Sequence, residues 1–258
     1  MCGIWALFMK YVEYNIDWKA LAFANQIRGP DETYYKENID HILAFHRLAI
    51  NGLSSAGMQP FHYHTANNDY ILMCNGEIYN HKELEKAVNN KISYTTYSKS
   101  DCEILLPYFV EICNDDIEML LNSINGEFSL IIINHNISTN FNTIYIGTDP
   151  MSVRPLFYQE LTHNTNSGLL ISSTLMGMSE TGFINNRLDQ GTYRIYTQIN
   201  NDVSLIETKC YYNYNCTSSI DEETDELYSK IVHTLKECVK RRLMSNRKIC
   251  CLLSGGWD

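Results

Sequence analysis

The chain has 258 residues, of which 45% are hydrophobic and 19% charged, with a formal net charge of −10 at pH 7. This composition is typical of a globular protein with a sizeable core, not of a disordered one. The negative charge argues against a nucleic-acid partner or an anionic membrane surface, because both are bound through basic faces. No run of about 18 apolar residues is present, so we expect no membrane span.

Nine cysteines are scattered along the chain without a CxxC pair. The first apolar run is short and follows no basic segment, so we expect no export signal. Without export, such a set of cysteines favours reduced thiols and a cytoplasmic location. No cysteine or histidine spacing matches a common zinc pattern, and we therefore expect no metal site.

Up to about residue 210, short β runs are separated by turns. The expected strands are Gly3–Met9, Ile42–Ile50, Tyr70–Cys74, Phe128–Asn134, Thr143–Thr148, Gly168–Ser173 and Tyr193–Ile199. Several are apolar almost throughout, which indicates strands that are covered on both faces. Two helices are expected among them. The first is His81–Val88 after Asn80, and the second is Asp101–Cys113 after Ser100, kinked or shortened by Pro107.

The pattern changes towards the C-terminus. Residues Asp221–Met244 carry acids in the first turns, bases in the last and apolar residues at helical spacing, which predicts one long amphipathic helix. A short strand, Ile249–Leu253, is expected after it. We therefore predict a first domain over residues 1–210. Residues 211–258 would form a linker, the long helix and the start of a second domain.

Cys2 would become the N-terminal residue if Met1 were removed, and methionine is commonly removed before a small residue. Its α-amine, with an ordinary pKa of about 7.7–8.0, would then be a base for its own thiol. A cysteine activated in this way is a strong nucleophile. By itself, a cysteine at position 2 is more often simply the residue that follows the initiator methionine.

Further motifs accompany MCGIW at the start of the chain. They are RGPD at Arg28–Asp31, HRLAI at His46–Ile50, NGEIYNH at Asn75–His81, SDCE at Ser100–Glu103 and RPLF at Arg154–Phe157. In this order they resemble the glutaminase domain of class II, N-terminal-nucleophile amidotransferases, and among these most of all the glutamine-hydrolysing asparagine synthetases. Residues Lys240–Gly256 resemble the entry of that family into its ATP-dependent synthetase domain.

The resemblance implies an α+β fold: a four-layer αββα N-terminal-nucleophile hydrolase sandwich, followed by the start of an α/β ATP-pyrophosphatase-type domain. It implies hydrolysis of L-glutamine to glutamate and ammonia through a thioester on Cys2, without a cofactor. In a complete enzyme the ammonia would serve the conversion of aspartate to asparagine with ATP and Mg. The synthetase half would here be a missing or separate domain.

The resemblance also gives the motifs catalytic roles. Cys2 would be the nucleophile, and the Asn75 side chain with the Gly76 N–H would stabilise the oxyanion that forms on the substrate amide. The plain structural interpretation of Asn75-Gly76 is a hairpin turn, which would itself present the N–H. Asn80 would shape this loop without touching the substrate.

Binding of free glutamine needs partners for two charges. By resemblance Arg47 would bind the α-carboxylate with its planar fork, while Asp101 and Glu77, with the Gly76 backbone, would accept hydrogen bonds from the α-amine. The pocket wall after Arg47 would be Leu48, Ala49, Ile50 and Asn51. The structural alternatives are a surface ion pair for Arg47 and an ordinary first-turn helix acid for Asp101. Arg28–Asp31 resembles the family's mobile loop over glutamine but is equally a turn signal.

The last residues resemble an unfinished phosphate-binding loop. The nucleotide-binding candidates are Ser254, Gly255, Gly256 and Asp258. Several positions depart from the family pattern. They are Ile27 where histidine is usual, Thr148 where arginine is usual, Ser152 where glycine is usual, and Ser172–Met178, which lacks the usual acid and lysine. The departures at Thr148, Ser152 and Ser172–Met178 lie late in the first domain, so they bear more on ammonia transfer to the synthetase half than on glutamine hydrolysis. The alternative function is a catalytically inactive, truncated binding or regulatory protein that keeps the fold.

Overall fold

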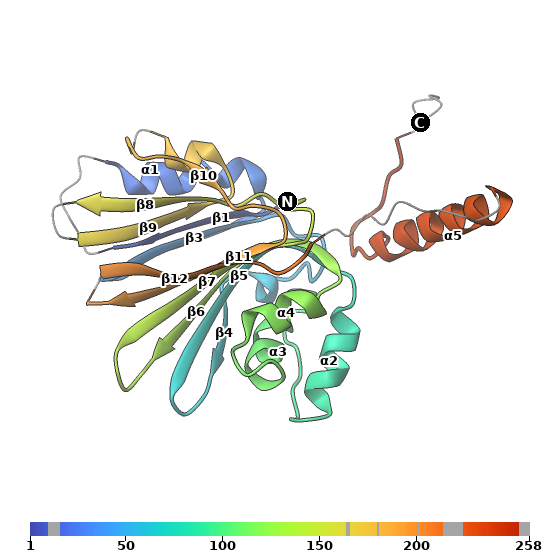
Figure 1. Cartoon of the computed structure of the whole chain (residues 1–258), viewed down its shortest axis with the longest axis horizontal. Helices are drawn as coiled ribbons and strands as arrows, with labels where there is room; N and C mark the ends of the chain where they lie inside the picture. The colour runs from blue at the N-terminus through green and yellow to red at the C-terminus, as the bar shows by residue number, and fades with distance from the viewer. Residues whose placement is uncertain (10–15, 164–165, 180, 201, 214–223, 253–258) are drawn as a thin grey trace.

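A computed structural model describes residues 1–9, 16–163, 166–179, 181–200, 202–213 and 224–252. It contains two six-stranded sheets, and every strand pair in them is antiparallel. Figure 1 shows the two sheets stacked on one another, with helices on the outer side of each. The arrangement is the α+β, four-layer sandwich that the family resemblance implies.

The first sheet contains the N-terminal strand at its centre. Its strands in spatial order are β10 (Asn186–Arg187), β8 (Phe157–His163), β9 (Asn166–Ser172), β1 (Gly3–Phe8), β3 (His41–Arg47) and β2 (Glu32–Glu37). Gly3 pairs with His46, so the start of β1 lies beside the end of β3. This register places Cys2 next to the residues that follow Arg47.

The second sheet contains the longest strands. In spatial order they are β12 (Asp202–Cys210), β11 (Thr192–Ile199), β7 (Phe141–Thr148), β6 (Gly126–Asn136), β5 (Asn68–Ile78) and β4 (Phe61–His64). β4 pairs only with the first half of β5, up to Leu72. The second half of β5 therefore has β6 on one side and is left open on the other for side chains and loops.

Alternating side chains of β1 pack into two different layers, as expected for a strand with period two. Ile4 and Phe8 lie in the core between the sheets, together with Ile131 of β6. Trp5 and Leu7 face the opposite way and pack against α1 (Trp18–Phe23) and the 3₁₀ helix η3 (Leu175–Met178). Because both faces are covered, the strand is apolar along its whole length.

The outer face of the second sheet is covered by three helices (Figure 1). They are α2 (His81–Asn89), α3 (Leu105–Glu111) and α4 (Ile117–Ser123). Their apolar residues, among them Leu84, Phe109 and Leu120, share one cluster with Leu72 and Phe128 of the sheet. Each of these five side chains is buried, so this layer is a full hydrophobic core.

The bounds of most sequence-based elements differ from those in the structure, and three of the differences concern the site. The strand expected at Ile42–Ile50 ends at Arg47. Beyond it, the Ala49 N–H donates to the Asp31 side chain and not to a neighbouring strand. The helix begins at Leu105, because the Asp101 carboxylate turns back to bind the N–H of Ile78. Asn75 and Gly76 form no hairpin turn, since both lie inside β5 and pair with β6.

The C-terminal helix α5 spans Thr224–Arg242 and lies to one side of the sandwich (Figure 1). Its apolar face is exposed over Tyr228, Ile231, Val232, Leu235 and Val239. The expected strand Ile249–Leu253 is not formed over the described residues 249–252, where no strand is available to pair with it. Leu253, and the nucleotide-binding candidates Ser254, Gly255, Gly256 and Asp258, lie outside the described residues. None of the described helices has the length and apolarity needed to cross a bilayer.

Candidate active site

A pocket lies beside the start of β1, the end of β3 and the second half of β5, and its space of about 490 Å³ includes the adjoining open solvent. It is lined by Met1, Cys2, Arg47, Leu48, Ile50, Asn51, Gly57, Gln59, Cys74, Asn75, Gly76, Glu77, Ser100, Asp101, Cys102 and Arg154. The structure thus brings together all the predicted catalytic and glutamine-binding residues except Ala49, which does not line the cavity. Ala49 lies next to lining residues on both sides in the sequence.

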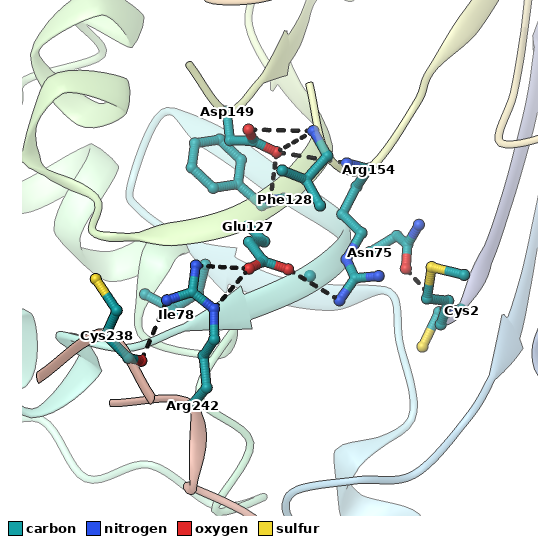
Figure 2. A network of polar contacts seen from close by, with 12 residues as sticks. Cys2, Asn75, Ile78, Glu127, Phe128, Asp149, Arg154, Cys238 and Arg242 are labelled. Carbon is teal, nitrogen blue, oxygen red and sulfur yellow. Dashed lines mark hydrogen bonds and ion pairs between the residues drawn. The ribbon is translucent and has the colours of Figure 1, made fainter. Parts of the chain in front are cut away.

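Cys2 and Asn75 are joined directly, although 73 positions separate them. The Cys2 N–H donates to Oδ1 of Asn75 over 2.9 Å, as Figure 2 shows. The amide nitrogen Nδ2 of Asn75 is buried and has no hydrogen-bond partner among the described residues. An unpaired buried donor is costly and uncommon, and such groups are found at functional sites. Asn75 therefore presents a free donor next to Cys2.

The Gly76 N–H faces the same side of β5 as two N–H groups that bind side chains. The Cys74 N–H donates to Oε1 of Gln59 over 2.6 Å, and the Ile78 N–H donates to Oδ2 of Asp101 over 2.6 Å. Since N–H groups two residues apart on a strand point to the same side, the Gly76 N–H lies between them and faces away from β6. A second donor is therefore available beside Asn75.

Gly76 is required by the packing of the two strands. A Cβ atom at this position would lie 2.3 Å from the backbone oxygen of Glu127 and 2.6 Å from Cβ of Phe128. Both contacts are far shorter than real Cβ atoms allow. The glycine therefore lets β5 approach β6 closely at the cavity.

The Cys2 thiol is held by the backbone of Leu48. The Leu48 N–H donates to Sγ of Cys2 over 3.4 Å, and the thiol donates to the Leu48 carbonyl over 3.7 Å. Burial raises the pKa of the Cys2 thiol, and the Leu48 N–H offsets only part of this effect. The thiol is therefore protonated near neutral pH and needs a base before it can act as a nucleophile.

Arg47 is almost fully buried, with 3% of its surface exposed. Its guanidinium donates to the carbonyl of Ser54 over 2.7 Å and to that of Gly52, and pairs with Glu32 at 3.3 Å. Gly57 leaves room for it, because a Cβ atom there would lie 2.2 Å from Nη2. The surface ion pair that the sequence left open is therefore only part of the environment of Arg47.

Two carboxylates contribute negative charge to the cavity. Asp101 is 5% exposed and accepts from the Ile78 N–H and, at 3.4 Å, from the Asn51 side chain. Burial raises the pKa of Asp101, and burial together with the Asp101 charge raises the pKa of Glu77. With Arg47 among the same lining residues, the cavity offers partners for both charges of a small zwitterion.

Arg28 and Asp31 of the RGPD motif lie close to this cavity. The Arg28 side chain donates to the Cys2 carbonyl over 3.3 Å. Oδ2 of Asp31 accepts from the Ala49 N–H over 2.8 Å, and the Asp31 N–H donates to the Arg47 carbonyl over 3.0 Å. Asn80 links the Ser123 carbonyl and the Asn125 N–H, as expected for a residue that shapes the loop.

Sequence reasoning missed several lining residues. Gln59 takes the place of a neighbouring strand at the open edge of β5, since its side-chain amide binds both the backbone N–H and the carbonyl of Cys74. Arg154, the first residue of the RPLF motif, lines the cavity and pairs with Glu127 at 3.4 Å. Cys102, within SDCE, is buried and contacts the Gly76 carbonyl at 3.7 Å. No local pattern distinguishes these residues from ordinary core and loop positions.

A family model described as the glutamine amidotransferase domain matches residues 1–215. A probable glutamine-hydrolysing asparagine synthetase of Acanthamoeba polyphaga mimivirus is 33% identical over the whole chain, and the match covers 48% of that protein. The glutamine-hydrolysing asparagine synthetase of Homo sapiens is 30% identical, again over the whole chain, with 47% of the human protein covered. The chain thus spans about half the length of the curated relatives it matches.

Solved structures share the fold at low sequence identity. Glutamine phosphoribosylpyrophosphate amidotransferase from B. subtilis, complexed with ADP and GMP, superposes with a TM-score of 0.62 at 16% identity. The match covers 82% of this chain and 49% of that one. A structure described as the allosteric regulatory enzyme of purine biosynthesis gives a TM-score of 0.61, also at 16% identity. At this identity the similarity concerns the fold alone.

Proposed function

Because the chain belongs to the glutamine amidotransferase domain family, we propose that it hydrolyses L-glutamine to L-glutamate and ammonia with Cys2 as the nucleophile. It is an amidotransferase domain of the asparagine synthetase-like kind. The observation that carries the proposal is the Asn75 amide, whose oxygen binds the Cys2 nitrogen while its own nitrogen is left as a free donor at the same cavity.

The base in this mechanism is the Cys2 nitrogen itself. Removal of Met1 turns this nitrogen from an amide into an α-amine, and Oδ1 of Asn75 is already in place to orient it. With Met1 present, burial lowers the pKa of the N-terminal amine. The Cys2 thiol acts in the opposite direction, while the charges of Arg154 and Arg28 lower this pKa further. The same surroundings would favour the neutral, proton-accepting form of the Cys2 amine near pH 7.

The reaction then follows from the groups present. The amine takes the proton of the thiol, and the thiolate adds to the side-chain amide carbon of glutamine. The oxyanion is stabilised by Nδ2 of Asn75 and the Gly76 N–H. The C–N bond breaks, the leaving nitrogen takes the proton from the amine, and ammonia departs. Water then hydrolyses the thioester on Cys2, which gives glutamate and restores the thiol.

Substrate recognition rests on charge complementarity. Arg47 would bind the α-carboxylate of glutamine, and Asp101 with Glu77 would bind its α-ammonium group. Leu48, Ile50 and Asn51 would form the wall between these two ends. Nothing in this chemistry requires a metal or an organic cofactor, because the nucleophile, base and oxyanion donors all belong to the chain.

The wider role is also a proposal. We infer that residues 1–210 act as the glutaminase domain of a cytoplasmic enzyme. A synthetase domain, in the same or a separate polypeptide, would use the ammonia to convert aspartate to asparagine with ATP and Mg. The names of the relatives support this, since they are called glutamine-hydrolysing asparagine synthetases and are about twice as long as this chain.

Glutamate release by the purified chain tests the proposed function. We expect the chain to release glutamate and ammonia in equal amounts, and Cys2→Ala to release neither. The control is Cys210→Ala, because Cys210 is exposed at the end of β12 and does not line the cavity. Equal glutamate release by the unaltered chain and Cys2→Ala would contradict the mechanism. No release by the unaltered chain would favour an inactive binding protein.

A further inference from the structure

We propose that Arg247 is a positioning residue for the glutamine pocket, and that residues 242–247 form a strap that fixes the pocket wall. This inference rests on the proposed function, because the pocket is taken to bind glutamine. The strap begins at the last residue of α5 and returns to the sandwich, where its side chains and backbone contact two loops beside the cavity.

The first anchor of the strap is Arg242. Its Nε and Nη2 atoms lie 3.0 and 2.8 Å from Oε1 of Glu127, and its guanidinium lies over the ring of Tyr79, 5.1 Å from the centroid. The other carboxylate oxygen of Glu127 pairs with the cavity-lining Arg154 (Figure 2). One carboxylate therefore connects the end of α5 to a residue that lines the cavity.

The second anchor is Asn246, which binds the pocket loop formed by residues 49–52. Its N–H donates to the Ile50 carbonyl over 3.1 Å, and its Oδ1 accepts from the Gly52 N–H over 2.9 Å. These two bonds resemble the pairing of a neighbouring strand. They hold the loop at a point where β3 has already ended.

The third anchor is Arg247, which joins the pocket loop to the RGPD motif. Its Nε donates to the Ala49 carbonyl, and its Nη2 pairs with Oδ2 of Asp31 at 2.8 Å. The same Asp31 oxygen accepts from the Ala49 N–H. Arg247, Asp31 and Ala49 thus form a closed ring of three polar contacts, and Arg247 is its only member from outside the first 52 residues.

The pocket loop carries groups that face the substrate site. Ile50 and Asn51 line the cavity, and Asn51 donates to Asp101. The Gly52 carbonyl accepts from the guanidinium of Arg47. The strap therefore reaches the proposed partners of both substrate charges through the loop, while no strap residue lines the cavity itself.

The strap contacts are of a kind that can open without unfolding the sandwich. The side chains of Arg247 and Asp31 are 51% and 32% exposed, so water and salt compete with their ion pair. Loss of the strap contacts would let the pocket loop sample other positions. Only the fraction of molecules in which the loop keeps its present position would then bind glutamine. The effect should therefore appear in substrate binding and not in the chemical step.

The experiment compares Arg247→Ala with Lys248→Ala in the full chain. Lys248 is the matched control, because it is the next residue, carries the same charge and, within the described part of the chain, forms no hydrogen bond or ion pair with the pocket loop. We expect Arg247→Ala to raise both KM and the Kd for glutamine about tenfold, with kcat within about twofold, as for a modest coupling between sites. Arg247→Lys should recover part of the lost glutamine affinity, because a lysine can still form an ion pair with Asp31.

Hydrogen exchange supplies a structural readout in the absence of glutamine. We expect the amides of Ala49 and Gly52 to exchange faster in Arg247→Ala than in Lys248→Ala, while amides in the centre of β6 stay unchanged. Glutamine binding, measured by calorimetry, separates the proposed role of Arg247 from the proposed glutaminase function. If the unaltered chain binds glutamine but releases no glutamate, the proposed function fails, and the Kd comparison still decides the role of Arg247.

The inference is overturned if Arg247→Ala and Lys248→Ala share the same Kd and KM. It is also overturned if Arg247→Ala lowers kcat with KM unchanged, because a positioning role acts on binding. Absence of glutamine binding by the unaltered chain overturns both the inference and the proposed function.

Discussion

The Cys2 N–H donates to Oδ1 of Asn75 over 2.9 Å, while Nδ2 of the same Asn75 amide is buried without a partner among the described residues. One side chain thus orients the nitrogen of the proposed nucleophile and presents a donor to the proposed oxyanion. The contact joins the start of β1 to the second half of β5, so its geometry depends on the packing of one sheet on the other.

Replacement of Asn75 tests the oxyanion role. Asn75→Ala removes one of two proposed donors, and we expect kcat for glutamine hydrolysis to fall about 100- to 1,000-fold with a smaller change in KM. Steady-state glutamate release gives both parameters. Asn134→Ala is the control, because Asn134 is a half-buried asparagine of β6 that does not line the cavity. A pure rise in KM for Asn75→Ala would contradict the oxyanion role.

Substrate affinity should depend on pH through Asp101 and Glu77. Burial raises the pKa of both carboxyl groups, so each takes up its proton at a higher pH than an exposed acid does. Since the α-ammonium of glutamine binds the charged forms, we expect KM to rise as the pH falls through the raised pKa of these groups, at a higher pH than exposed carboxyl groups would give.

The pH dependence of KM in variants identifies the titrating group. Asp101→Asn should have a high KM at neutral pH and lose most of the further rise in acid. Glu77→Gln should keep more of this rise, since the Asp101 carboxyl still titrates. A KM that is independent of pH in the unaltered chain, over a range where it remains folded by circular dichroism, would argue against the carboxylate partners.

Gly76→Ala tests the close approach of β5 and β6. The added Cβ would lie 2.3 Å from the Glu127 backbone oxygen, so one strand must shift. We expect a loss of about 1–3 kcal/mol in the free energy of unfolding, together with lower activity. Gly147→Ala should cost less, because its Cβ would meet only the flexible Leu121 side chain, at 3.1 Å. Urea unfolding of both variants measures the difference, and equal costs would contradict the account.

The helices should respond differently to substitution. Leu120 of α4 is fully buried against the second sheet, so Leu120→Ala should cost about 2–5 kcal/mol of unfolding free energy. Leu235 of α5 is 60% exposed, and Leu235→Ala should cost well under 1 kcal/mol by the usual range for surface substitutions. Thermal unfolding of the two variants compares them directly, and a comparable loss of stability in Leu235→Ala would show that α5 packs on the sandwich.

The sequence predicted the central strands well because their residues are apolar on both faces, as in β1 and β6. It missed the strands β2, β4, β8, β10 and β12 and the helices α1 and α4. In β2 and β12 most residues are exposed or half-buried and show no continuous apolar run. The prediction also ended the strand at Cys74 and left a hairpin turn as the plain interpretation of Asn75-Gly76. The dipeptide lies within β5 because it pairs with Ser129 and Phe128 of β6, while the short β4 leaves the other edge of this half of β5 open to the site.

The motifs identified most of the cavity residues, although Cys2, Arg47, Asn75 and Asp101 lie on separate elements. Motif order cannot reveal contacts made by side chains of ordinary type. The Gln59 amide that binds Cys74 and the Arg247 guanidinium that binds Asp31 depend on the packed structure. Long-range polar contacts of this kind leave no periodic signal in a single sequence.

The most direct test of the central claim is to identify the residue that carries the glutamyl group during turnover. The protein is mixed with glutamine, quenched rapidly in acid and analysed by mass spectrometry of its N-terminal peptide. We expect a glutamyl thioester on Cys2 in molecules that lack Met1 and have a free α-amine. Glutamate release by protein that retains Met1, or a glutamyl group on any other residue, would contradict it.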